Sequence, residues 1–141
     1  LYEAARAGVN VQMVIRGICC AYTEAKGLKD NLHAISIVDE YLEHGRVFVF
    51  DNGKRPNVYI SSADWMVRNL DHRIEVACPV YEQELQQELI DIMNIQLAEN
   101  VKARILDADQ NNTYVEPHPD APVVRSQIAT YRYLKNKIYI T

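Results

Sequence analysis

The clearest structural signal in this chain lies in residues 47–60, Val47-Phe48-Val49-Phe50-Asp51-Asn52-Gly53-Lys54-Arg55-Pro56-Asn57-Val58-Tyr59-Ile60. Two runs of β-branched and aromatic residues, 47–50 and 58–60, flank the tripeptide Asp51-Asn52-Gly53. Asn and Gly tolerate the positive φ angles of a tight turn, and such runs favour extended backbone. The segment is therefore predicted to form a β-hairpin.

Strand and helix signals continue on both sides of this hairpin. Residues 9–15 alternate and then become wholly apolar, which is typical of a buried strand in an α/β sheet. Residues 1–7 resemble the last turns of a helix closed by Gly8, so the chain reads as a piece of a longer protein. Residues 21–29 have no apolar period and are predicted to form a loop.

A helix is predicted to begin after a cap at Asp30 or Asn31 and to stop at Gly45, which places His44 at its end. Its apolar residues recur at helical spacing: Leu32, Ile35, Val38 and Leu42.

The remaining elements alternate in the same way. Two further helices are predicted, over residues 82–100 and 125–137. Residues 73–78, stopped by Pro79, and residues 101–106 read as strands, residues 65–71 as a turn or short helix, and residues 107–122 as a loop. The alternation predicts a layered α/β or α+β domain.

Composition limits the function. The 141 residues carry 15 Lys and Arg against 19 Asp and Glu, a net charge of −4, and 48% are hydrophobic, which predicts one globular domain. An acidic balance argues against a nucleic-acid or membrane-surface binder held by a basic field. No apolar run approaches the ~20 residues of a spanning helix, and the first residues do not resemble a signal peptide. Cys19, Cys20 and Cys78 are interpreted as reduced thiols.

Residues suited to phosphate chemistry are concentrated in two segments, 43–46 and 60–75. The candidates are His44, Arg46, Ser61, Ser62, Asn69, Arg73 and Glu75. Histidine exchanges a proton near pH 7, and arginine holds phosphate oxygens in a bidentate manner. Plainer roles remain open: a helix cap for His44, a surface ion pair between Arg73 and Glu75, and turn positions for the serines.

Several familiar signatures are absent from the sequence. It contains no Gly-x-x-x-x-Gly-Lys loop, no Gly-x-Gly-x-x-Gly and no Gly-x-Ser-x-Gly elbow. The cysteines and histidines show no metal-ligand spacing, so no metal site is predicted here.

A set of ordered segments closely resembles the C-terminal part of type 1 bacterial polyphosphate kinase. These are Val14-Ile15-Arg16-Gly17-Ile18-Cys19-Cys20, Ile35-Ser36-Ile37-Val38-Asp39-Glu40-Tyr41-Leu42-Glu43-His44-Gly45-Arg46, Tyr59-Ile60-Ser61-Ser62-Ala63-Asp64-Trp65-Met66, Arg73-Ile74-Glu75-Val76 and Val101-Lys102-Ala103-Arg104. The resemblance implies half of a phospholipase D-like fold, with a mixed β-sheet flanked by helices, over residues 1–141 as a single C-terminal catalytic domain.

The family transfers the terminal phosphate of ATP reversibly onto inorganic polyphosphate, with magnesium, through a phosphohistidine. The resemblance implies that this histidine lies in a preceding domain and that the magnesium ligands lie elsewhere, so that the fragment alone is inactive. Its expected partners are ATP, ADP, polyphosphate and the preceding domains, with no nucleic acid. The full-length enzyme is expected to be a homo-oligomer in the cytoplasm, with membrane association as an option.

The same resemblance assigns roles to individual residues. Arg16 and His44 match the positions that contact nucleotide and phosphate, Arg73 is expected to line the same pocket, and His44 is the candidate acid or hydrogen-bond donor. The supporting pocket is Arg46, Ser61, Ser62, Asn69 and Glu75. Arg46 stands where phospholipase D-like proteins have Lys, and Asp64 where they have Asn. A phosphodiesterase and a non-catalytic polyphosphate- or nucleotide-binding module remain as alternatives.

Overall fold

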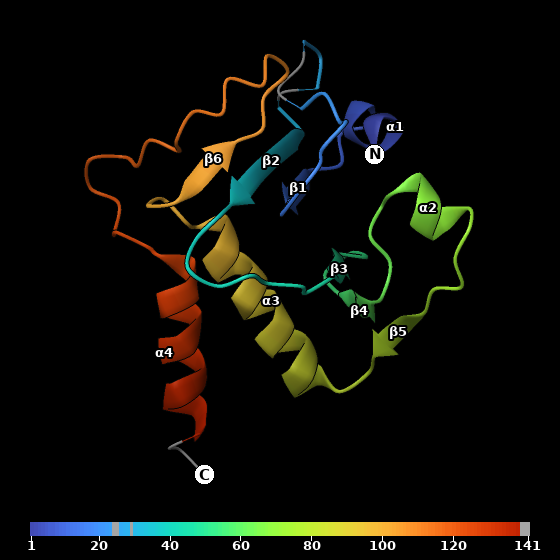
Figure 1. Cartoon of the computed structure of the whole chain (residues 1–141). Helices are drawn as coiled ribbons and strands as arrows, with labels where there is room; N and C mark the ends of the chain where they lie inside the picture. The colour runs from blue at the N-terminus through green and yellow to red at the C-terminus, as the bar shows by residue number, and fades with distance from the viewer. Residues whose placement is uncertain (24–25, 29, 139–141) are drawn as a thin grey trace. The chain divides into compact units, whose positions relative to one another are not determined.

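The computed structural model describes residues 1–23, 26–28 and 30–138. The chain divides into two compact units, one of Leu1–Leu42 with Asn94–Thr141 (unit 1) and one of Glu43–Met93 (unit 2). Within the described residues each unit contains a three-stranded sheet, so the predicted α/β class is confirmed (Figure 1). Part of the predicted loop over residues 21–29, namely residues 24, 25 and 29, lies outside the described residues.

The sheet of unit 1 is mixed, as predicted. Strand β1 (Val11–Val14) pairs in parallel with β2 (Leu32–Ile37), and β2 pairs antiparallel with β6 (Ala103–Ile105). Helix α1 (Tyr2–Arg6) supplies Ala5 to the core, which it shares with Leu28 and Leu32. All three residues are buried, so this small cluster anchors one end of the sheet.

The helix predicted to end at Gly45 is wrong. Residues 32–37 form β2, and the described residues 38–46 form neither helix nor strand. The buried residues Leu32 and Ala34 lie two apart and so share one face of a strand. An apolar spacing of three or four over so short a run fits either structure, and pairing with β1 and β6 decides for the strand.

The start of helix α4 (Ser126–Ile138) is tied to residues 39–41, which follow β2. Arg125 donates to both oxygens of Asp39, at 2.8 and 2.6 Å, and lies 2.9 Å from a carboxylate oxygen of Glu40. Gln127 receives a hydrogen bond from the Tyr41 backbone N–H and donates to the Tyr41 carbonyl. The predicted helix over residues 125–137 is confirmed, and these contacts fix where it begins.

Helix α3 (Gln83–Leu97) is also confirmed, and a buried carboxylate follows its end. Glu99 is 1% exposed and accepts the backbone N–H groups of Val101 at 2.8 Å, Lys102 at 3.0 Å and Ser126. Burial raises the pKa of Glu99, but these hydrogen bonds outweigh burial and leave the pKa below its ordinary value. Glu99 therefore joins the end of α3 to the start of α4 as an ionised group.

Unit 2 contains the predicted hairpin and one more strand. Strands β3 (Val47–Phe50), β4 (Asn57–Ser61) and β5 (Ala77–Val80) form an antiparallel sheet in that order. In the turn, Asn52 and Gly53 have φ angles of 47° and 64°, the left-handed region that their residue types favour.

The strand predicted over residues 73–78 is displaced, because β5 begins at Ala77 and runs through Pro79. Proline lacks a backbone N–H, but β5 is an edge strand of this sheet and Pro79 is tolerated there. The preceding connection from β4 to β5 contains the short helix α2 (Val67–Leu70), as predicted.

Candidate functional site

Two serines hold the ends of the connection between β4 and β5 together: Ser61, the last residue of β4, and Ser62, which follows it. Ser61 Oγ donates to the Val76 carbonyl at 3.2 Å and accepts the Ala63 N–H at 3.0 Å. Ser62 Oγ accepts the Val76 N–H at 3.1 Å, and the Val76 carbonyl accepts the Ser62 N–H at 3.0 Å. These bonds bring residues 61–63 and 75–76 together although no strand pairing extends to residue 75.

A carboxylate lies at the centre of this connection. Glu75 accepts a hydrogen bond from Ser62 Oγ on one oxygen and from Asn69 Nδ2, at 2.7 Å, on the other. The hydrogen bonds from Ser62 and Asn69, followed by the positive charges of Arg73 and Arg46, lower the pKa of Glu75. Glu75 is therefore an ionised acceptor that orients two polar side chains.

Asn69 is the buried member of this group and is only 3% exposed. Its Oδ1 is buried and has no hydrogen-bond partner among the described residues. The carboxylate of Glu75 accepts but does not donate, so it sets the orientation of the amide with Nδ2 toward it. The contact with Glu75 therefore uses only the nitrogen of this buried amide.

A second charged contact precedes the hairpin. Arg46 Nε and Nη2 donate to the two oxygens of Asp64 at 2.8 and 3.2 Å, a bidentate pair. Arg46 Nη1 donates to the backbone carbonyl of His44 at 3.3 Å. The contact with Asp64 raises the pKa of Arg46 above its ordinary value, so Arg46 is charged at all relevant pH values.

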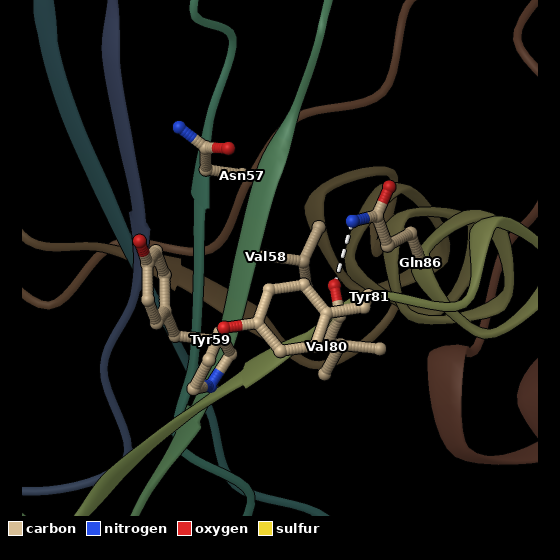
Figure 2. Close-up of a pocket in the computed structure, with 7 residues that line it drawn as sticks. Asn57, Val58, Tyr59, Val80, Tyr81 and Gln86 are labelled. Carbon is tan, nitrogen blue, oxygen red and sulfur yellow. Dashed lines mark hydrogen bonds between the residues drawn. The ribbon is translucent and has the colours of Figure 1, made fainter.

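A pocket in unit 2 differs in character from these two contact groups (Figure 2). It has a volume of about 140 Å³ and is lined by Asn57, Val58, Tyr59, Pro79, Val80, Tyr81 and Gln86. Gln86 Nε2 donates to the Val80 carbonyl at 2.6 Å, as the dashed line shows. All seven lining residues are uncharged, so this hollow offers no charge complement to phosphate.

The described residues offer no cluster of metal-binding side chains. No group of three or more His, Cys, Asp or Glu side chains among them is arranged to hold a metal ion, so they do not fit a magnesium site of their own. Over residues 1–23, 26–28 and 30–138 there is also no helix with the length and apolar character needed to cross a bilayer.

Comparison with known families identifies the chain's relatives. Residues 1–127 match the model of the family described as polyphosphate kinase C-terminal domain 2. The chain belongs to the polyphosphate kinase family. This confirms the resemblance carried by the segments around Arg16, His44 and Glu75.

Individual polyphosphate kinases agree with this assignment. The chain is 52% identical over 136 residues to the polyphosphate kinase of Vibrio parahaemolyticus and 48% identical to that of Escherichia coli K12, in each case over 96% of this chain. It spans only 19–20% of the length of those relatives. The crystal structure of polyphosphate kinase from Porphyromonas gingivalis matches 100% of this chain and 22% of its own, with a TM-score of 0.95 and 48% identity.

Five of the sequence-predicted residues of this polyphosphate kinase domain lie in the two contact groups of unit 2. Ser61, Ser62, Asn69 and Glu75 belong to the connection between β4 and β5, and Arg46 to the pair with Asp64. The side chains of His44 and Arg73 are exposed in the same unit, and Arg73 is near enough to Glu75 to lower its pKa. Arg16 is exposed in unit 1, two residues after β1.

Two expectations about these residues are corrected. His44 does not end a helix, because residues 38–46 are not helical, so a role as a helix cap is ruled out. Arg73 and Glu75 do not lie on a strand, because β5 begins only at Ala77. Glu75 instead bonds to Ser62 and Asn69.

From the sequence, Asp64 is named only as the residue standing in place of an asparagine, and it is not included in the predicted pocket. The hairpin register brings Arg46 opposite Ser61, whose N–H donates to the Arg46 carbonyl at 2.9 Å. An aspartate three residues beyond Ser61 then falls within reach of an arginine side chain. The opposite charges of Arg46 and Asp64 therefore indicate a pair once the register of the hairpin is known.

Proposed function

We propose that this chain is the C-terminal catalytic domain of an enzyme that transfers the terminal phosphate of ATP reversibly to inorganic polyphosphate. The whole of residues 1–141 would act as one domain of that enzyme. The phosphohistidine intermediate would form on a histidine in a preceding domain, and this chain would supply groups that bind and polarise phosphate. The match of residues 1–127 to the polyphosphate kinase domain carries the proposal.

The exposed basic side chains support these roles. Arg16 and Arg73 would each hold phosphate oxygens of ATP or of the polyphosphate end, because a guanidinium offers paired donors to an oxyanion. His44 would donate a hydrogen bond or a proton to the phosphoryl group or to the leaving oxygen. Phosphoryl transfer depends mainly on positioning and on charge stabilisation, and these groups can supply both.

The polar group around Glu75 would keep the neighbouring side chains in position and would not itself react. Its ionised carboxylate already accepts from Ser62 and Asn69, so it would keep their donors oriented near Arg73. The ligands of the magnesium ion would lie outside this chain. ADP, polyphosphate, the preceding domains and further copies of the enzyme would be the other partners, at a cytoplasmic or membrane-associated location.

The alternative of a phosphodiesterase is disfavoured by the state of Arg46. In phospholipase D-like enzymes the corresponding lysine is expected to contact phosphate. Here all three nitrogens of the Arg46 guanidinium already donate, two to Asp64 and one to the His44 carbonyl. Arg46 is therefore poorly placed to replace that lysine.

The test uses the full-length enzyme that contains this chain. His44→Ala and Arg16→Ala should each lower ATP-dependent polyphosphate synthesis by about 100-fold, the usual effect of removing a proton donor or a charge-stabilising group. Arg55→Ala, an exposed arginine in the hairpin turn, is the matched control and should leave synthesis unchanged. Circular dichroism would check that the variants are folded.

The outcomes separate the three candidate functions. Near-normal synthesis by both variants would refute the roles of His44 and Arg16. Hydrolysis of a phosphodiester without ATP-dependent chain growth would establish the phosphodiesterase instead. A kinase whose activity survives replacement of His44, Arg16 and Arg73 together would make this chain a binding module. Calorimetry with ATP and long-chain polyphosphate, on the same variants, would measure the contribution of each side chain to binding.

A further inference from the structure

Asp64 and His44 are linked through one arginine. The carboxylate of Asp64 receives two hydrogen bonds from Arg46, at 2.8 and 3.2 Å, and the third nitrogen of that guanidinium donates to the His44 carbonyl at 3.3 Å. The side chains of Arg46 and Asp64 are 25% and 30% exposed, so the pair is shielded from water over most of its surface. Such a bidentate pair is more rigid than an exposed ion pair.

His44 itself lies in a segment without regular structure. Residues 42–46 form neither helix nor strand, and β3 begins only at Val47. The backbone of Arg46 is fixed by the Ser61 N–H, which donates to its carbonyl at 2.9 Å. From that anchored position the Arg46 side chain reaches back two residues and holds the carbonyl of His44.

Asp64 is anchored as well. It follows β4 by three residues, and its neighbour Trp65 packs on Phe48 of β3 with ring centroids 5.7 Å apart. The carboxylate is therefore attached to the sheet through β4 and through an aromatic contact. A fixed carboxylate, a planar guanidinium and a backbone carbonyl form a continuous connection from the sheet to His44.

We propose that Asp64 is a positioning residue for His44, acting through Arg46, and that Arg46 serves this purpose rather than binding phosphate. The proposal rests on the role given to His44 under the proposed function. The imidazole must meet a phosphoryl group at hydrogen-bond distance, and a misplacement of about 1 Å can lower a rate by about 100-fold. Without Asp64, the guanidinium would be free to turn toward solvent or phosphate, and the His44 carbonyl would lose its donor.

The test is a set of kinetic cycles in the full-length enzyme. Asp64→Asn removes the charge but keeps the size of the side chain, and Arg46→Lys keeps the charge but cannot form the bidentate pair. Each should lower kcat for polyphosphate synthesis by roughly 10-fold while KM for ATP changes much less. The kcat of the double variant should be no lower than that of either single variant, since both substitutions break the same connection. Asp71→Asn, an exposed aspartate in the same unit, should behave as wild type.

A background lacking His44 gives the decisive comparison. If Asp64 acts through His44, Asp64→Asn should cause no further loss of activity in the His44→Ala enzyme. In the enzyme that retains His44, Asp64→Glu should be more active than Asp64→Asn, because glutamate keeps the charge. An equal loss in both backgrounds would overturn the proposal, because a general structural defect lowers activity whether or not His44 is present. A higher KM for polyphosphate in Arg46→Lys at unchanged kcat would also overturn it, since Arg46 would then bind phosphate.

Failure of the proposed function is distinguishable from failure of this inference. If His44→Ala alone leaves synthesis near normal, the role of His44 is wrong and the positioning role of Asp64 is overturned with it. If His44→Ala is severely impaired but Asp64→Asn and Arg46→Lys are both normal, only the positioning role fails. Thermal melting of each variant identifies any that do not fold, and Arg46→Lys then takes the place of Asp64→Asn in the His44→Ala background.

Discussion

Asn69 donates its side-chain amide to Oε1 of Glu75 at 2.7 Å, so a residue of helix α2 holds a carboxylate that lies six positions further along the chain. Ser62 donates to the other oxygen of the same carboxylate. The connection from β4 to β5 is therefore organised around one charged acceptor. One donor, Ser62, precedes the short helix and the other, Asn69, lies within it, which makes the connection sensitive to single substitutions.

Replacement of Asn69 should destabilise the protein. Asn69→Ala removes a buried donor to an ionised group, and we expect a loss of about 1–3 kcal/mol in the free energy of unfolding. Asn69→Asp should be worse at pH 7, because it places a second carboxylate against Glu75, and the difference between the variants should shrink in acid. Urea denaturation would measure both. Asn94→Ala, exposed on α3, is the control and should have little effect; equal stability of Asn69→Asp and wild type would contradict this account.

Glu75 should make a pH-dependent contribution to stability. Its pKa in the folded protein lies below the ordinary value of about 4.3, so ionised Glu75 stabilises the fold above that pH. The contribution is lost as the pH falls through the lowered pKa. The stability difference between wild type and Glu75→Gln should therefore stay constant from pH 6 to 8 and decline below about pH 4.

Urea denaturation of both proteins across this range is the measurement. A difference between wild type and Glu75→Gln that grows in acid would have the wrong sign for a lowered pKa. It would mean that the bonds from Ser62 and Asn69 do not favour the ionised form.

Glu99 should be the most sensitive carboxylate of unit 1. Its oxygens accept three backbone N–H groups from Val101, Lys102 and Ser126. Glutamine keeps one acceptor oxygen but presents an NH₂ group to the other donors, and an unpaired buried donor costs about 1–3 kcal/mol. Glu99→Gln should therefore lower the free energy of unfolding by about that amount, as measured by urea denaturation. Glu116→Gln, at an exposed position, is the matched control; a similar small effect for both variants would refute the role of Glu99 as the acceptor of these three N–H groups.

Local residue types predicted the parts of the fold that short-range chemistry decides. Asp51-Asn52-Gly53 predicted the turn between β3 and β4, and the pattern of residues 82–100 predicted α3. The end of β5 was missed because Pro79 was taken as a stop, whereas the strand continues to Val80. Whether a proline ends a strand depends on which edge of the sheet is free, and that is a property of the assembled sheet.

The candidate site was predictable in its residue types but not in its contacts. Clustering of Ser61, Ser62, Asn69 and Glu75 between two strands indicated a polar group, and the structure brings these side chains together. Asp64 was missed because its partner Arg46 lies 18 residues away, across the hairpin. The register of β3 and β4 creates that proximity, so side-chain pairs across a hairpin follow only after the pairing is known.

Leu32 and Leu42 distinguish the observed strand from the predicted helix. On the helix both would lie on one buried face, and truncation of either would be costly. In the structure Leu32 is fully buried against Ala5 and Leu28, whereas Leu42 is 73% exposed. Leu32→Ala should therefore lower the free energy of unfolding of the 141-residue chain by about 2–5 kcal/mol, because it leaves a cavity in a small core. Leu42→Ala should change it by less than about 0.5 kcal/mol. Comparable losses in urea denaturation for the two variants would favour the helix over β2.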